Sequence, residues 1–252
     1  MSGEETTMGS RARFLRGAVA AIAVATICSG AGAASAQPEG FPPLPGLDAV
    51  PSRTTLAVRT PFGVGWGTAN QEEVRGALSM AKLYLADYAL RHGDGSEEDI
   101  ALSERMIRFS DNAAADTIEA KYPGAIAAVA TEYGLEQTST TGAWSTSLTS
   151  AADLADFLSA KQTSEPTSPI LRWMTEATPV AADGTAQDWG TARLPGVRGT
   201  KWGWSDLPPQ EVASASFGPG FTVAAITLGT PQEQTTDVLE AMIEASLAVP
   251  FP

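Results

Sequence analysis

Short runs rich in β-branched and aromatic residues stand towards both ends of the chain, and they predict strands. Two early runs, separated by Thr60 and Pro61, suit a hairpin or a pair of neighbouring strands. Three late runs are separated by turns at 206–209 and 218–220. The predicted strands cover 54–59, 62–66, 196–202, 212–217 and 221–228.

Between these strands the apolar residues recur at helical spacing, with polar turns or capping residues between the runs. The predicted helices cover 77–90, 96–108, 112–121, 124–133, 149–160, 170–176 and, after the last strand, 233–247. Strands at both ends and helices between them predict an α+β domain. Its antiparallel sheet would be formed from both ends of the chain, with a helical subdomain inserted between them.

The first residues have the order of a secretory signal peptide. Three arginines precede an apolar run at 17–27, and the small residues Ala34-Ser35-Ala36 follow. We therefore expect a signal peptide over 1–36, a Pro- and Gly-rich linker over 37–51, and a catalytic domain over 52–252. The protein would be secreted or held in the cell envelope, with no integral membrane span after cleavage.

Cys28, the one cysteine, lies within this leader. Lipid anchoring at Cys28 is the alternative to full release, although Ile27 stands where a lipidation signal wants a small residue. Cleavage after Ala36 would leave no thiol for a disulfide. The formal charge of −13 disfavours nucleic acid and anionic membranes as partners, and we expect a monomer.

Elimination narrows the chemistry further. His92 is the sole histidine, so the chain lacks the ligands for a structural zinc site. A Ser-His-Asp triad would have to use His92, which sits in a polar turn typical of a surface residue. The sequence has no G-x-S-x-G elbow, no phosphate-binding loop and no dinucleotide fingerprint. We therefore predict neither a metal nor another cofactor.

Three short motifs carry candidate chemistry. Ser79 and Lys82 are three residues apart on a predicted helix, so they share a face, and a desolvated lysine can activate a serine nucleophile. Ser110-Asp111-Asn112 follows after one intervening helix, and Lys201-Trp202-Gly203 lies on a late strand. Each motif also has a structural explanation: a surface lysine after a helix-starting serine, a helix N-cap, and the end of a strand.

The order of these motifs resembles the S-x-x-K, S-D-N and K-T-G signature of class A β-lactamases and penicillin-binding proteins. The resemblance extends from about Thr54 to Leu247. It implies that Ser79 is the acylated nucleophile, that Lys82 is its general base or a proton relay, and that Ser110 passes a proton to the leaving group. Lys201 would supply positive potential for a substrate carboxylate and for Ser110.

The resemblance also implies the binding residues. Asn112 would hold the amide side chain of the substrate, and the backbone N–H groups of Ser79 and Trp204 would form the oxyanion hole. Trp202 and Gly203 would line the same strand. The ligand would be a small molecule or a peptidoglycan peptide.

Two departures from the pattern bear on function. Trp202 stands where the family has a hydroxyl residue that binds the substrate carboxylate, and its bulk would either point to the other face of the strand or fill the site. No arginine is present on the next strand, 212–217, to serve as a second anchor. The interval 133–149 is too short for the Glu-x-x-x-Asn loop whose glutamate activates the deacylating water in class A enzymes, and Glu136 is the single carboxylate in it.

These features leave competing hypotheses open. The first is a slow serine hydrolase that acts on cell-wall peptides or esters; the second is a weak β-lactamase. The third is a catalytically degenerate member of the family that binds a peptidoglycan fragment or a protein partner. The retained motif residues favour chemistry, whereas Trp202 and the missing glutamate favour binding.

Overall fold

The computed structural model describes residues 46–60 and 64–248, and side chains are described as far as Met242. The predicted signal peptide and most of the predicted linker lie outside these residues. The last residues of that linker form a 3₁₀ turn, Leu47–Ala49, whose Leu47 is buried against Leu56 and Val238. The described residues thus include 46–51 of the predicted linker.

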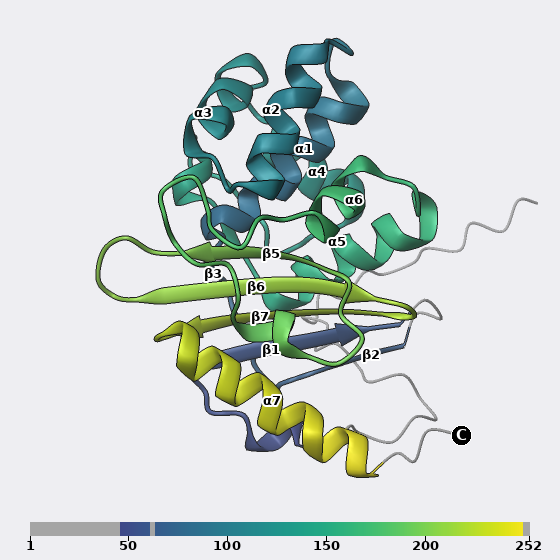
Figure 1. The fold of residues 1–252 in the computed structure, drawn as a ribbon, viewed down its shortest axis with the longest axis vertical. Coiled ribbons are helices and arrows are strands. Elements are labelled where there is room, and N and C mark those ends of the chain that lie inside the picture. Colours follow the sequence, from purple (N-terminus) through teal and green to yellow (C-terminus); the bar gives the residue numbers. More distant parts are fainter. Residues whose placement is uncertain (1–45, 61–63, 249–252) are drawn as a thin grey trace, which may run out of the picture. The chain divides into compact units, whose positions relative to one another are not determined.

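Five strands form one antiparallel sheet in the order β2-β1-β7-β6-β5 (Figure 1). Their bounds are β1 (Thr54–Arg59), β2 (Gly65–Gly67), β5 (Gly199–Trp204), β6 (Glu211–Gly218) and β7 (Phe221–Leu228). The first strand pairs with the last along Thr54–Thr227 to Arg59–Thr222. The α+β fold with a sheet built from both ends of the chain is thereby confirmed.

Seven α-helices complete the described part, all close to the predicted ranges. They are α1 (Ala81–His92), α2 (Glu97–Arg108), α3 (Asn112–Lys121), α4 (Ala125–Tyr133), α5 (Ala151–Ser164), α6 (Pro169–Thr175) and α7 (Pro231–Ala248). Ser96, Asp111 and Ser150 cap α2, α3 and α5 by accepting backbone N–H bonds, as the polar residues before each apolar run predict. None of the helices within 46–60 and 64–248 is long and apolar enough to cross a bilayer.

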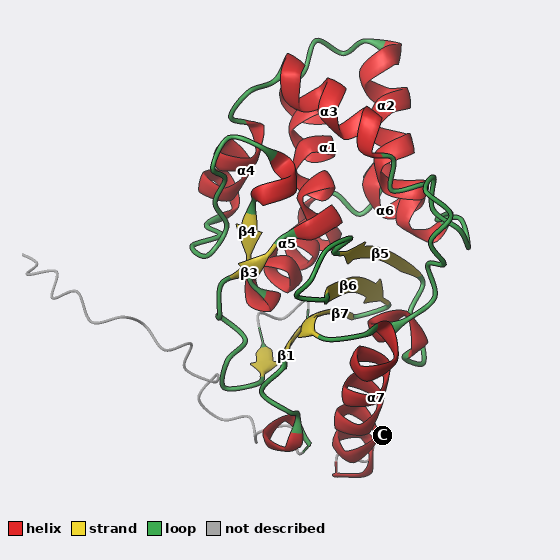
Figure 2. Ribbon diagram, turned by 90° about the vertical axis from the view of Figure 1, so that its left-hand side faces the viewer, coloured by secondary structure: helices red, strands yellow, loops and turns green. Residues whose placement is uncertain are grey.

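The sheet is covered on both faces. Helix α5 packs against β1, β6 and β7, whereas α7 packs against the other face (Figure 2). Helices α1, α2 and α6 continue beyond β5, the strand at the edge of the sheet (Figure 1). The edge strand thus meets the helical layer, and residues from both parts come together there.

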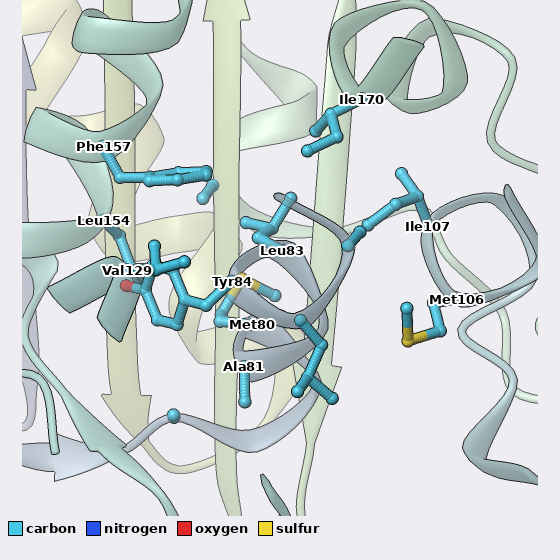
Figure 3. Close-up of a cluster of buried hydrophobic side chains, with 14 of the residues drawn as sticks. Met80, Ala81, Leu83, Tyr84, Met106, Ile107, Val129, Leu154, Phe157 and Ile170 are labelled. Atoms are coloured by element: carbon cyan, nitrogen blue, oxygen red, sulfur yellow. The ribbon is translucent and has the colours of Figure 1, made fainter. Parts of the chain in front are cut away.

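The larger core lies between the sheet and these helices and begins at the segment that carries the predicted nucleophile. Met80, Leu83 and Tyr84 are fully buried, and the Tyr84 and Phe157 rings meet edge to face at 5.2 Å. Figure 3 shows these side chains among residues of α2, α4, α5 and α6. Packing on this scale holds the start of α1 in one position.

The sequence patterns miss several short elements. A two-stranded sheet pairs β3 (Arg75–Gly76) with β4 (Leu148–Thr149), and 3₁₀ turns cover Trp144–Thr146 and Gly190–Arg193. The first helix is also shorter than predicted, because Leu78–Met80 is a 3₁₀ turn and α1 begins at Ala81. Elements of two to four residues are too short to show a hydrophobic period.

Candidate active site

The first motif occupies a strained turn at the start of α1. Leu78 has a φ of 51°, in the left-handed region that non-glycine residues rarely adopt. Ser79 therefore lies in the 3₁₀ turn, whereas Lys82 lies in the first turn of α1. The Lys82 Nζ donates to the Ser79 Oγ at 2.9 Å, which is the hydrogen-bonded pair that their spacing predicts.

The second motif brings three more acceptors to the same lysine. Ser110 has a φ of 54°, and this turn directs both its carbonyl and its hydroxyl to Lys82, at 2.7 Å and 3.4 Å. Asp111 caps α3, so the second motif serves as a helix N-cap and also supplies residues to this cluster. Asn112 accepts from Lys82 through Oδ1 at 2.6 Å, and its Nδ2 donates to no described residue.

The third motif lies on the edge strand β5 and contacts the other two motifs. The Lys201 Nζ donates to the Ser110 Oγ at 2.8 Å and to the Trp202 carbonyl at 2.9 Å. Gly203 lies directly against the nucleophile turn: a Cβ there would stand 2.9 Å from the Leu78 Cβ and 3.0 Å from the Ser79 nitrogen. A larger residue at 203 would push the strand away from Ser79.

The side chains of Lys82 and Lys201 are both fully buried, and burial lowers the pKa of each. Desolvation lowers the pKa of Lys82 from 10.5 to about 8, although four carboxylates, chiefly Asp111, pull it upwards. Desolvation, and next the charge of Lys82, also holds the pKa of Lys201 well below its ordinary value. A lysine with a pKa near 8 is a competent general base close to neutral pH.

The side chain of Trp202 does not belong to this cluster, although its carbonyl accepts from Lys201. Side chains alternate along a strand, so Lys201 faces the helical layer and Trp202 faces the opposite side of the sheet. Its indole N–H donates to the Trp189 carbonyl at 3.0 Å, and the Trp189 ring contacts both Trp202 and Trp204, at centroid distances of 6.4 Å and 5.8 Å. Of the two orientations left open by the sequence, the structure has the one that points away from Ser79.

Trp144 is a site residue that the motifs do not predict. Its ring lies over the Lys82 Nζ at 4.5 Å from the centroid, and its indole N–H donates to Asp116 at 2.7 Å. It belongs to the 133–149 interval, which lacks the glutamate loop of class A enzymes. Its contact with Lys82 is long-range, and the sequence around Trp144 carries no signal for it.

Other candidates lie apart from the cluster. His92 is at the surface, where it contacts Glu132 and Arg91, so its surface position is confirmed. Glu136 is exposed. Within the described residues, no carboxylate accepts a hydrogen bond from Ser79, Lys82, Ser110 or Lys201, and no group of three or more His, Cys, Asp and Glu is placed to hold a metal ion.

The arrangement defines a class of fold: that of penicillin-binding proteins, β-lactamases and D-alanyl-D-alanine carboxypeptidases. A β-lactamase from Sphaerobacter thermophilus is 14% identical, with a TM-score of 0.61 over 82% of this chain and 97% of its own. A D-alanyl-D-alanine carboxypeptidase from Mycobacterium tuberculosis is 20% identical, with a TM-score of 0.58 over 85% and 96%.

Penicillin-binding protein D2 from Listeria monocytogenes, bound to cefotaxime, is 18% identical, with a TM-score of 0.56 over 76% of this chain and 96% of its own. No protein-family model and no curated protein sequence matches the chain. At these identities the likeness establishes the fold, and the chemistry has to be argued from the residues of this chain.

Proposed function

We propose that the protein is an exported serine hydrolase of the penicillin-recognising type that acts slowly on a cell-wall peptide, an ester or a β-lactam. One observation carries the proposal: a continuous chain of hydrogen bonds joins Ser79, Lys82, Ser110 and Lys201. Such a chain supplies a nucleophile, a base and a route for the proton, which acyl transfer requires.

The steps follow from this chain. Neutral Lys82 takes the Ser79 proton as the Oγ attacks the carbonyl, and the backbone N–H groups of Ser79 and Trp204 stabilise the oxyanion. The proton then passes from Lys82 to Ser110 and on to the leaving group, whose bond to the carbonyl carbon breaks. Asn112 is the candidate for binding the acyl side, since its Nδ2 is available to a substrate carbonyl.

Release of the acyl group would be slow. Two observations support slow release: no carboxylate of the described residues accepts a hydrogen bond from Ser79, whose hydroxyl is bonded to Lys82, and the Trp144 ring lies over the lysine that could activate water. Acylation and deacylation should therefore separate in time, with one equivalent of acyl group retained per protein.

A mass measurement tests the proposal. The protein is incubated with a neutral activated ester, p-nitrophenyl acetate, and separately with a β-lactam, and intact mass is followed over hours. We expect one long-lived adduct on Ser79, absent from Ser79→Ala. No adduct with either reagent at millimolar concentration would refute the hydrolase, and rapid multiple turnover would refute slow release.

A binding module is the second candidate. It is favoured by the surroundings of Lys82, whose Nζ lies within hydrogen-bonding distance of four acceptors. The three N–H donors of an ammonium group match such a set better than the two of a neutral amine. A degenerate member of this fold would retain a peptidoglycan fragment or a protein partner without acylation. Reversible binding of muropeptides to both the wild type and Ser79→Ala, with equal affinity and no adduct, would favour this candidate.

Export is part of the proposal and rests on the sequence of the leader. N-terminal sequencing of the secreted protein should begin at Gln37. Lipid on Cys28 at the terminus would contradict this and place the protein on a membrane surface.

A further inference from the structure

A pocket of about 460 Å³ lies at the start of β5, bordered by the end of α5, by α6 and by the residue before the strand (Figure 1). Arg198 directly precedes β5, whereas Gly203, the fifth residue of that strand, lies against the Ser79 turn. Strand residues rise about 3.3 Å each, so the pocket is roughly 16 Å along the strand from the nucleophile. It is therefore separate from the site of the three motifs.

Two arginines line this pocket, and neither has an acidic partner among the described residues. Arg172 belongs to α6 and Arg198 precedes β5, and both are exposed. Every other arginine within 46–60 and 64–248 forms an ion pair with an aspartate or a glutamate. The Arg172 guanidinium lies 5.9 Å from the ring centroid of its neighbour Trp173, which leaves its N–H groups free. In a chain with a formal charge of −13, this pocket thus gathers uncompensated positive charge.

A buried hydroxyl group lines the same pocket. Ser168 is only 5% exposed, and it precedes α6 without capping that helix through its side chain. Its Oγ forms no hydrogen bond with any residue that the structure describes. Buried polar groups normally have a partner, so this hydroxyl is a donor or acceptor for a molecule in the pocket.

Much of the remaining wall is apolar. Leu171 and Phe217 are buried and line the pocket. The Phe217 ring is fixed against the sheet, since a Cβ at Gly199 would lie 2.5 Å from it, and the Phe217 carbonyl accepts from the Arg198 N–H at 2.9 Å. Pockets of this volume, with apolar walls and a few convergent polar groups, are typical of sites for small molecules.

We infer that this pocket binds a small organic anion in which a carboxylate or phosphate group is joined to an apolar ring or chain. The anionic group would accept from Arg172, Arg198 and Ser168, because guanidinium groups form charge-assisted hydrogen bonds with carboxylate and phosphate oxygens. The apolar part would contact Leu171 and Phe217. This binding does not depend on the proposed acylation reaction.

Calorimetric titration with four naphthalene derivatives tests the inference. 2-Naphthoate and 2-naphthyl phosphate carry the two anionic groups, 2-naphthylmethanol is neutral, and 2-naphthylmethylamine is cationic at neutral pH. We expect at least one anion to bind at millimolar or lower concentration, the alcohol to bind at least about tenfold more weakly, and the amine not to bind. The tighter of the two anions identifies the preferred headgroup.

Substitutions locate the bound anion. Arg172→Gln and Arg198→Gln should each weaken binding about tenfold, as for the loss of one charge-assisted hydrogen bond. Ser168→Ala should weaken it roughly threefold, as for a neutral donor. The control is Arg193→Gln, which removes an exposed arginine that is paired with Asp188 and should leave the dissociation constant unchanged.

Several results would overturn the inference. They are the failure of both anions to bind at millimolar concentration, and equal affinity for the anions and the neutral alcohol. Unchanged affinity in both Arg172→Gln and Arg198→Gln, or an equal loss in Arg193→Gln, would place the anion elsewhere. The titrations are repeated with Ser79→Ala, in which we expect the same affinities, so a failure of the proposed hydrolase would leave this inference standing.

Discussion

The protonation of Lys82 makes a quantitative prediction about acylation. With a pKa of about 8, roughly 9% of Lys82 is neutral at pH 7 and roughly 90% at pH 9. The acylation rate should therefore rise about tenfold over these two pH units and level off above pH 9. With an ordinary lysine pKa of 10.5, the same interval would bring about a hundredfold rise and no plateau.

The assay is the single-turnover burst of p-nitrophenol from p-nitrophenyl acetate between pH 6 and 10. Background hydrolysis is measured with Ser79→Ala at each pH and subtracted. A burst rate that is independent of pH, or one that still climbs tenfold per unit at pH 10, would refute the assignment of Lys82 as a desolvated base.

Stability supplies a second measure of the same pKa. The folded-state pKa lies below the unfolded value, so the unfolded chain binds more protons between pH 8 and 10.5 and folding stability rises with pH across that window. The difference of about 2.5 units corresponds to about 3 kcal/mol. Relative to Lys82→Met, the free energy of unfolding of the wild type should increase by an amount of this order between pH 8 and 10.5, as measured by urea titration.

Three substitutions extend these tests. Trp144→Ala should admit water to Lys82. General-base catalysis typically accelerates a reaction by a factor of about 10² to 10⁴, so the lifetime of the Ser79 adduct in the mass assay should fall at least about tenfold. An unchanged lifetime would mean that Trp144 does not protect the ester. Trp202→Thr should lower the free energy of unfolding by about 3 kcal/mol, as for other buried tryptophans, without accelerating acylation by a β-lactam; faster acylation would indicate that position 202 reaches the substrate. Lys161→Met removes one partner of a buried ion pair, in which the Lys161 Nζ lies 2.7 Å from Asp87. It should lower the free energy of unfolding by about 3 to 5 kcal/mol in urea denaturation. The double variant with Asp87→Asn should recover part of that loss.

The parts of the site that follow from local spacing could be predicted from the sequence. Ser79 and Lys82 meet because residues three apart share a helical face, whether the turn is 3₁₀ or α. The capping preference of Asp111 fixes the start of α3 and leaves Ser110 in the turn before it. A sheet formed from both ends of the chain also follows from the sequence, because strands near both ends of one domain can share a sheet.

The aromatic residues of the site could not be placed in this way. Trp144 reaches Lys82 from a 3₁₀ turn of three residues, and nothing in its local sequence indicates that long-range contact. The face to which Trp202 points depends on strand register, since a shift by one residue exchanges the faces. Trp189 and Asp183 come from a segment without a periodic pattern, whose path is set by hydrogen bonds to Arg108 and Phe109.

The position of Trp144 connects the two halves of the proposed reaction. In a site without a second base, the lysine that activates Ser79 is also the group that would have to activate a water molecule for release. The first task needs a desolvated lysine, and the indole over Lys82 contributes to that desolvation. The second task needs water at the same nitrogen, which the indole excludes. One side chain therefore favours acylation and opposes release, so that exposing Lys82 should raise its pKa and slow acylation while it shortens the lifetime of the adduct.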